Sequence, residues 1–307
     1  MYLMRTLHEI KYSEEVRAAI ANRTPIVALE STIISHGLPR PQNLEVAREV
    51  EEIVRAKGAT PATIAILDGT VHIGLDPVNL EKIANRDDIS KASSRDLAIA
   101  VARGISAATT VAATAHLAVM AGISVFATGG LGGVHRGAHQ SYDESADLTA
   151  LSALDITVVC SGVKSILDVG ATLERLETLA IGVIGYKTNE FPGFYLTNSG
   201  FTIEHRVDSA AEIVDIQRAR VLLKTNNSAL IVTNPVKHQM DRVLHDEILK
   251  GGLAAAQAEA ITGKDVTPFL LEYFHSTSKG ESLRVNIEII KSNTALAAEI
   301  AVAGTQI

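Results

Sequence analysis

The sequence predicts an α/β protein with a mostly parallel central sheet that helices cover on both faces. Short runs rich in Val, Ile and Ala alternate with segments of helical length along the whole chain. These runs are apolar throughout, which is typical of strands buried on both faces. The chain contains no composition break and no low-complexity linker. We therefore expect residues 1–307 to form a single domain, with residues 1–23 as a segment that leads into it.

The first quarter of the chain carries clear start and stop signals. Ser13 and Asn43 stand where helices begin, and Gly58 stands where the second helix ends. Asp68-Gly69 predicts a type I′ hairpin turn, because both residue types tolerate positive φ. The expected elements are a helix at 13–22, a strand at 26–29, a helix from 43 to 58, and hairpin strands at 63–67 and 71–73.

Two Ser-x-x-Asp patterns in the middle of the chain predict capping boxes. Ser93 with Asp96 opens a helix that starts just after Lys91, and Ser165 with Asp168 opens another. These two helices run to about residues 103 and 178. Further helices are expected at 110–121, 146–154, 239–260, 268–277 and 282–302, strands at 124–127, 156–160, 181–186 and 231–233, and a loop at 187–201.

Composition excludes several classes of protein. A net charge of −7 and a pI near 5.8 argue against nonspecific binding to nucleic acid, and the absence of Trp argues against a base-stacking platform. A single cysteine, Cys160, excludes an internal disulfide and fits a reducing compartment. No apolar run reaches membrane-spanning length, and the first ten residues lack a signal-peptide core. We expect a soluble, cytoplasmic protein.

The stretch from residue 127 to residue 168 contains many of the candidate functional residues. It holds a GGLGG run at 129–133, followed by His135 and Arg136. Glycines let the backbone approach a ligand closely, so this loop is a candidate phosphate cradle, although a strand-to-helix turn needs glycine for geometry alone. The run is neither a Walker A loop nor a good dinucleotide-binding fingerprint.

Glu30 and Lys164 each follow an apolar strand. Glu30 is either a surface acid at a strand end or a partly buried carboxyl whose pKa its apolar neighbours raise, which suits proton donation. Lys164 either reaches solvent from its loop or is desolvated before a helix. Desolvation and the positive end of a helix disfavour the charged form of a lysine, so its amine becomes a candidate nucleophile.

Lys91 and the hydroxyls of Thr109 and Thr110 form a candidate anion site. A cation just before a helix N-terminus is unfavourable unless an anion is present, and a phosphate there resolves the conflict. A solvated loop lysine is the simpler alternative.

Asp143, Glu144 and Asp147 cluster where a helix is expected to begin. Acids at a helix N-terminus complement the helix dipole, which explains the cluster without a ligand. One such carboxylate with retained waters is equally typical of an Mg²⁺ or Mn²⁺ site.

Several long motifs resemble those of the pseudouridine-5′-phosphate glycosidase family. The resemblance extends from about residue 24 to residue 300. The motifs are ALESTIISHGLPRPQN, DISKASSRDLA, TTVAAT, VFATGGLGGVHRGA, SADL, CSGVKSILD, FPGFY and GKDVTPFLL. It implies an α/β/α sandwich, a homotrimer, and Mn²⁺-dependent cleavage of pseudouridine 5′-phosphate to uracil and ribose 5-phosphate.

The resemblance also implies roles for individual residues. Glu30 is implied as the proton donor, Lys164 as the covalent nucleophile and Asp143 as the metal ligand. The implied substrate contacts are Lys91, Val111, Ser145, Ala146 and Asp147, with His135 on the phosphate side. Tyr142, Glu144 and Arg40 depart from the family pattern, which has Phe, Ile and Tyr there, and no implied catalytic position is affected.

This inventory suits the cleavage of a C-glycoside. Such a bond lacks the exocyclic heteroatom that paired-carboxylate glycosidases protonate. Protonation of the ring oxygen with attack of an amine at C1′ opens the sugar instead, and an iminium then assists C–C cleavage. Two rivals stay open at this point: a sugar kinase that requires ATP, and a non-catalytic phosphosugar sensor.

Overall fold

The computed structural model describes residues 10–261 and 266–305 and contains one mixed sheet. Its main strand order is β1-β4-β3-β2-β7-β8-β11-β9-β10, with β6 beside β3 and β5 beside β6. Neighbouring strands are parallel, except that β4 and β6 run antiparallel to β3. The predicted mostly parallel sheet is therefore confirmed. The strands are β1 (Lys11–Tyr12), β2 (Ile26–Leu29), β3 (Thr60–Leu67), β4 (Thr70–Ile73), β5 (Ser90–Ala92), β6 (Ala107–Thr109), β7 (Val125–Ala127), β8 (Thr157–Cys160), β9 (Gly182–Tyr186), β10 (Arg206–Val207) and β11 (Leu230–Thr233).

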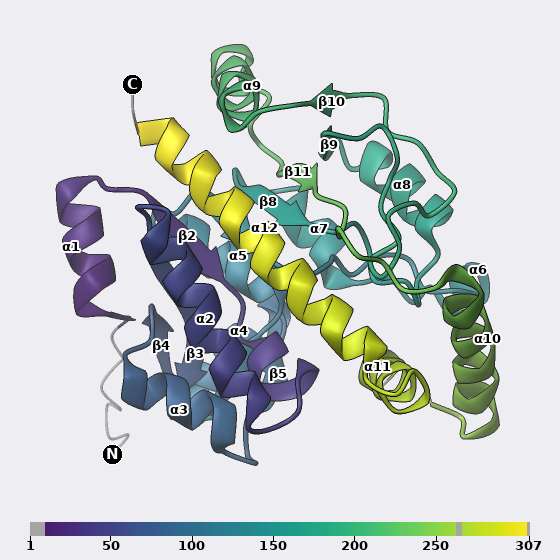
Figure 1. The fold of residues 1–307 in the computed structure, drawn as a ribbon. Coiled ribbons are helices and arrows are strands. Elements are labelled where there is room, and N and C mark those ends of the chain that lie inside the picture. The colour runs from purple at the N-terminus through teal and green to yellow at the C-terminus, as the bar shows by residue number, and fades with distance from the viewer. Residues whose placement is uncertain (1–9, 262–265, 306–307) are drawn as a thin grey trace.

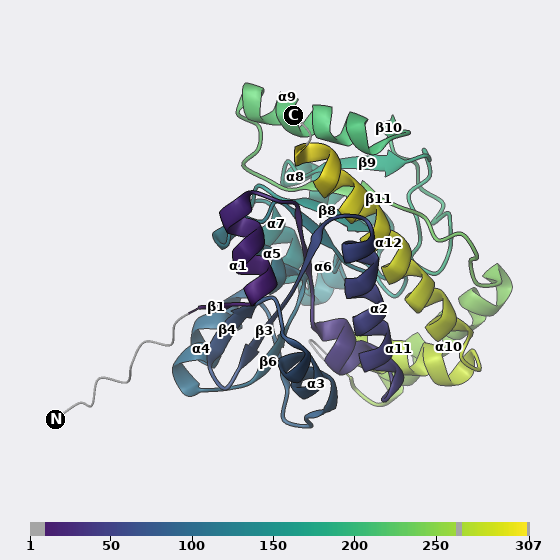
Figure 2. The ribbon, with the colours of Figure 1, turned by 60° about the vertical axis from the view of Figure 1, so that its left-hand side comes forward.

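Helices cover both faces of the sheet, as the sequence predicts (Figures 1 and 2). One face packs against α2, α9 and α12, and the other packs against α5, α7 and α8. The helices are α1 (Glu14–Asn22), α2 (Gln42–Ala56), α3 (Pro77–Asn85), α4 (Leu97–Arg103), α5 (Val111–Met120), α6 (Ala138–Ser141), α7 (Ala146–Leu151), α8 (Val169–Thr178), α9 (Ala210–Leu223), α10 (Arg242–Ala258), α11 (Val266–Thr277) and α12 (Glu281–Thr305).

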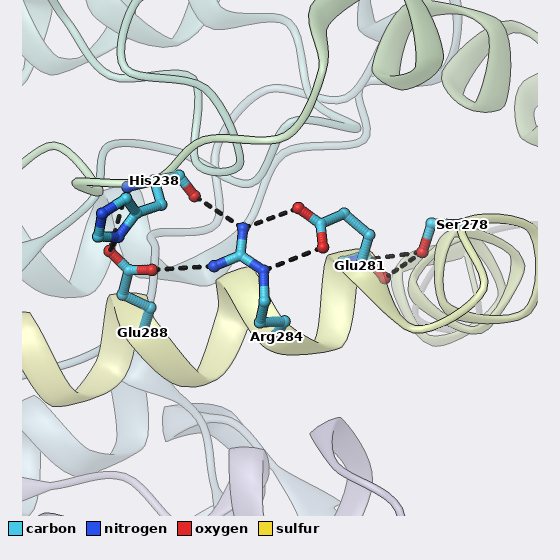
Figure 3. Close-up of polar contacts among 6 residues, drawn as sticks. His238, Ser278, Glu281, Arg284 and Glu288 are labelled. Atoms are coloured by element: carbon cyan, nitrogen blue, oxygen red, sulfur yellow. Dashed lines mark hydrogen bonds and ion pairs between the residues drawn. The ribbon is translucent and has the colours of Figure 1, made fainter.

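Helix α12 runs diagonally across one face of the sheet (Figure 1). Polar contacts hold its first half in place. Arg284 forms ion pairs with Glu281 at 2.7 Å and with Glu288 at 3.1 Å. Its guanidinium also donates to the carbonyl of His238, which lies in the segment after β11 (Figure 3). The contacts in Figure 3 therefore tie α12 to the segment that leaves the sheet at β11.

The predicted hairpin is confirmed in detail. Asp68 and Gly69 join β3 to β4 with φ values of 49° and 75°. Both values are positive, as a type I′ turn requires. Ser93 and Asp96 form the predicted capping box, in which the backbone N–H of Ser93 donates to Asp96 Oδ2 at 2.9 Å.

The second predicted capping box is wrong. Helix α8 begins at Val169, and the side chain of Asp168 caps it by accepting from the N–H of Ala171 at 3.0 Å. Ser165 lies in the preceding turn, and among the described residues its hydroxyl has no hydrogen-bond partner. Ser165 therefore lies too far from the first turn of the helix to cap it.

Some elements were not predicted. The helix expected just after Lys91 begins only at Leu97, after a short 3₁₀ turn at Ser94–Asp96, and Lys91 itself lies in β5. Helix α3 and a π-helical turn at Ile33–Gly37 were also missed.

Residues 263–265 of the GKDVTPFLL motif lie outside the described residues. Within the described ranges, no helix combines the length and apolarity that a membrane span requires.

Candidate active site

A buried acid lies where β2 ends. Glu30 is 8% exposed as a residue, and the hydroxyl of Thr128 donates a hydrogen bond to its Oε1. Thr128 directly follows β7, the parallel neighbour of β2, so the two residues emerge at the same sheet edge. Burial raises the pKa of Glu30, and the Lys164 ammonium and the Thr128 hydroxyl oppose this effect. Of the two alternatives that the sequence left open for Glu30, the structure shows the buried carboxyl, and a raised pKa suits proton donation.

Lys164 emerges from a tight loop after β8. Its backbone N–H donates to the carbonyl of Leu131 at 3.1 Å, and the N–H of Leu131 donates to the carbonyl of Gly162 at 2.9 Å. Gly162 has a φ of +77°, and a Cβ there would lie 2.2 Å from the carbonyl oxygen of Pro192. The loop therefore requires glycine, and it fixes the backbone from which the Lys164 side chain extends.

One cavity brings the predicted acid and the predicted amine together. Glu30, Lys91 and Lys164 line it, along with Gly129 and Gly130 of the glycine run. A Cβ on Gly130 would lie 2.6 Å from the ring of Phe194, which also lines the cavity. Because residue 130 is a glycine, the ring of Phe194 can pack against the glycine run and line the same cavity as the two basic side chains and the acid.

Lys91 pairs with Ala108 as part of β5, and it lies two residues before Ser93, which caps the 3₁₀ turn that leads into α4. The Thr109 hydroxyl donates to the carbonyl of Ile64 at 2.7 Å inside the core, so it is not an anion ligand. Thr110 caps α5 by accepting from the N–H of Ala113 at 3.5 Å. Both Lys91 and Lys164 line the cavity, and two basic side chains there favour an anionic ligand.

Asp147 joins three segments that the sequence predicted as substrate contacts. Its Oδ1 accepts from the N–H of Ala112 at 2.9 Å, and its Oδ2 accepts from the N–H of Gly132 at 2.8 Å. Ser145 caps α7 and donates its N–H to the carbonyl of Gly133 at 2.9 Å. Val111 and Ala146 are the first residues of α5 and α7, so all of these groups meet around the glycine run.

Asp143 and His135 form a second pair beside the glycine run. The N–H of His135 donates to the carbonyl of Asp143 at 3.0 Å, and His135 Nδ1 lies 3.8 Å from Asp143 Oδ2. Burial lowers the pKa of His135, the Asp143 carboxylate opposes this, and Lys164 and Lys91 lower it further. The net lowering favours the neutral form of the imidazole, which is the form that can act as a ligand.

The donor set near Asp143 suits a hydrated divalent cation rather than a protein-enclosed one. Among the described residues, no group of three or more His, Cys, Asp or Glu side chains is placed to hold a metal ion. A single carboxylate with retained waters is a common arrangement for Mg²⁺ and Mn²⁺.

The three departures from the family pattern lie outside the cavity lining. Glu144 forms an ion pair with Arg175 at 2.9 Å and so links the Asp143 segment to α8. Tyr142 is 86% exposed, with a φ of 56°. Arg40 pairs with Asp87 on the surface.

Sequence reasoning assigned no role to several residues at the site. Thr128 bonds the acid, and His36, Phe194 and Asn286 line the cavity. The signal for Thr128 was available, because it ends its strand as Glu30 does. Asn286 is an amide among the buried positions of α12, which is another signal of function. Cys160 is fully buried in the core, as predicted, and burial raises the pKa of its thiol to about 12.

Comparison with known proteins connects this site to a family. Residues 15–303 match the family described as Indigoidine synthase A like protein. The chain belongs to this family. Curated family relatives include the pseudouridine-5′-phosphate glycosidases of Salinispora tropica and Streptomyces griseus. They are 55% and 54% identical over 97% and 96% of this chain, and these matches cover 93% and 92% of the relatives.

Two solved structures show the same fold. An indigoidine synthase A-like protein from Thermotoga maritima superposes with a TM-score of 0.87 at 38% identity, over 98% of both chains. The prealnumycin C-glycosynthase AlnA in complex with ribulose 5-phosphate superposes with a TM-score of 0.88 at 33% identity, over 96% of both chains.

Proposed function

We propose that this chain cleaves the C–C glycosidic bond of pseudouridine 5′-phosphate and releases uracil and ribose 5-phosphate. The relatives that share half of its sequence carry this activity in their names. The observation that carries the proposal is one cavity that holds a buried, hydrogen-bonded acid beside a lysine on a rigid loop. Cleavage of a C-glycoside requires a proton donor and a nucleophile, and Glu30 and Lys164 can supply them.

We propose that the first step opens the ribose ring. Glu30 donates its proton to O4′, and the Lys164 amine attacks C1′ after its ammonium form has released a proton to water. The C1′–O4′ bond breaks with its electron pair on O4′, so C1′ now carries the Lys164 nitrogen and the base. The raised pKa of Glu30 supports this role, because the acid must be protonated when substrate binds.

The C–C bond then breaks without a heteroatom leaving group. The Lys164 nitrogen loses a proton, and C5 of uracil takes one. The electron pair of the C1′–C5 bond stays with the base, while the nitrogen lone pair forms a C1′=N bond. Water hydrolyses this imine, which frees ribose 5-phosphate and regenerates the Lys164 amine.

Positively charged and hydroxyl groups would orient the substrate. We propose that Lys91 binds the sugar phosphate, with His135, Thr110, Val111, Ser145 and Ala146 around the glycine run as further substrate contacts. Such anchors contribute orientation rather than bond making. Both oxygens of Asp147 already accept backbone N–H groups, so we assign it to shaping this contact surface.

We propose that Asp143 holds one Mn²⁺ ion through its carboxylate, with waters in the remaining positions and neutral His135 alongside. When bound, the ion would supply positive charge that stabilises the negative charge of the substrate. The exposed fraction of the Asp143 side chain, 32%, supports an ion that keeps its waters.

We propose that the chain assembles as a homotrimer. The family resemblance supports this, and so does an apolar surface at the end of α9. There Val221, Leu222 and Leu223 are 60%, 82% and 70% exposed. Contiguous exposed apolar side chains often mark protein interfaces. Light scattering that shows a monomer at micromolar concentration would reject this assembly.

Incubation with pseudouridine 5′-phosphate and Mn²⁺ tests the activity, with free uracil measured by chromatography. Uracil release supports the proposal, and binding of ribose 5-phosphate without uracil release indicates a phosphosugar sensor instead. A calorimetric titration with ATP tests the kinase alternative. Because each step above is reversible, isotope-labelled uracil with ribose 5-phosphate should yield labelled pseudouridine 5′-phosphate.

A further inference from the structure

A fully buried amide on α12 contacts the ends of three neighbouring strands. The NH₂ group of Asn293 donates to the carbonyl of Thr128 at 2.8 Å. Its side-chain oxygen accepts from Asn234 Nδ2 at 3.0 Å. Ser161 Oγ lies 3.3 Å from the Asn293 nitrogen and donates its own proton to the carbonyl of Asn234 at 2.7 Å. Since these partners follow β7, β8 and β11, one side chain holds all three strand ends.

The first branch of this network reaches the acid. Thr128 accepts from Asn293 through its carbonyl and donates to Glu30 through its hydroxyl. Both groups belong to one residue, whose own N–H donates to the carbonyl of Val159 at 3.0 Å. A shift of the Thr128 carbonyl therefore moves the hydroxyl that binds Glu30.

The second branch reaches the amine. The N–H of Ser161 donates to the carbonyl of Gly129 at 2.9 Å, and Asn293 Nδ2 lies 3.3 Å from that same carbonyl. Two further bonds continue along the loop, from Leu131 to Gly162 and from Lys164 to Leu131. A series of backbone hydrogen bonds that begins beside Asn293 thus joins the glycine run to the loop at residues 161–164.

We propose that Asn293 is a positioning residue that fixes the separation between the Glu30 carboxyl and the Lys164 amine. Asn293 does not line the cavity, so it acts through Thr128 and Ser161 rather than on the substrate. A buried amide whose donor and acceptor are both used holds its partners in one arrangement. This inference rests on the proposed function.

Other contacts hold α12 in place without Asn293. Arg284 ties the first half of the helix to the segment after β11 (Figure 3). Ile289, Ile290, Leu296, Ala297 and Ala298 bury the apolar face of the helix. Loss of the Asn293 amide should therefore loosen the strand ends and leave the helix docked.

The test compares Asn293→Ala and Asn293→Ser with Thr294→Val as the matched control. Thr294 is the next residue on the same helix and is equally buried, and among the described residues its hydroxyl has no hydrogen-bond partner. We expect the Asn293 variants to stay folded by thermal unfolding and to lose kcat on the order of 100-fold with little change in KM. The Thr294→Val enzyme should keep wild-type kcat.

A pH profile separates positioning from a merely structural role. Glu30 is faced by Lys164, Lys91 and Asp147 and by the Thr128 hydroxyl, and this hydroxyl lowers its pKa. When the hydroxyl moves away, the high-pH limb of kcat/KM should shift to higher pH. Folded Asn293 variants with unchanged kcat and an unchanged limb would overturn the inference.

Two further arms cover the remaining outcomes. If neither Asn293 variant folds, Asn234→Ala removes the partner of the Asn293 oxygen instead. Its kcat and the high-pH limb of its kcat/KM profile are then measured and interpreted in the same way. A wild-type enzyme that releases no uracil defeats the proposed function itself. An active wild type with unaffected variants defeats this inference alone.

Discussion

The Asp147 carboxylate accepts a hydrogen bond from the backbone N–H of Gly132 at 2.8 Å, which links the start of α7 to the glycine run. Its other oxygen accepts from Ala112, in the first turn of α5. A carboxylate can accept at both oxygens, whereas an amide can accept at only one. Asp147 is therefore a buried acid whose charge state and shape both matter.

We expect Asp147→Asn to destabilise the protein by about 1–3 kcal/mol, because the new NH₂ group faces a backbone donor. Urea unfolding measures this change, and uracil release should fall in parallel. Asp215→Asn is the control. Asp215 lies on α9 with a side chain that is 72% exposed, so its loss should change stability by no more than about 0.5 kcal/mol. Equal effects of the two substitutions would contradict the role given to Asp147.

Gly132→Ala should lower activity by moving its neighbours. A Cβ at this position would lie 2.2 Å from Ser145 Oγ and 2.7 Å from Asp147 Oδ2. Both side chains must shift, which disturbs the start of α7. Gly304→Ala on α12 is the control, since nothing lies within 4 Å of its Cβ position, and it should be neutral or stabilising by up to about 1 kcal/mol. Wild-type steady-state kinetics for Gly132→Ala would refute this reading.

Lys164→Ala should abolish turnover while the protein still binds substrate. Borohydride reduction of the wild type in the presence of ribose 5-phosphate should trap the sugar on Lys164, which peptide mass spectrometry can locate. Lys250→Ala, at an exposed position on α10, should leave both turnover and trapping intact. A trapped sugar on any other lysine would show that the nucleophile has been misassigned.

Activity should fall as pH rises through the raised pKa of Glu30, because a general acid works only when protonated. Glu30→Gln should lower kcat by about 10²–10⁴-fold and remove this limb of the pH–rate profile.

Glu30 should also make stability depend on pH. Its pKa is higher in the folded state than the ordinary value of 4.5, so ionisation favours the unfolded state. The stabilising contribution of the neutral acid is complete below the ordinary value and is lost as pH rises through the folded-state pKa. Relative to wild type, Glu30→Gln should therefore gain stability as the pH rises above the ordinary value of 4.5. A pH-independent difference would argue against a buried neutral acid.

Removal of metal with a chelator should abolish activity, and Mn²⁺ should restore it. Asp143→Asn should weaken Mn²⁺ binding, which the electron paramagnetic resonance signal of free Mn²⁺ reports without an activity assay. Glu144→Gln is a neighbouring control, because Glu144 pairs with Arg175. Full activity in excess chelator, or equal Mn²⁺ affinity in both variants, would exclude Asp143 as the ligand.

Local signals in the sequence predicted much of the fold. The hairpin at Asp68-Gly69 and the helix cap at Ser13 depend only on neighbouring residues, and both are confirmed. The Ser165 cap fails because Asp168, three residues later, is placed to bond the first turn. The short strand that contains Lys91 was missed because it forms only by pairing with β6, a partner more than ten residues away.

The site was predictable only in part. Glu30 and Lys164 stand out because each follows an apolar strand, and their convergence follows from parallel neighbours. Asn293 gives no comparable signal. Its contacts with Thr128 and Ser161 span more than 130 residues, so they exist only once α12 has packed across the sheet.

The single thiol of the sequence, that of Cys160, has a practical consequence. It lies at the end of a central strand, fully enclosed, one residue before a contact of Asn293. The thiolate is the form that attacks thiol reagents, and this buried environment strongly disfavours it. The rate at which such a reagent modifies the native protein therefore measures how often the sheet opens beneath the active site. No engineered label is required.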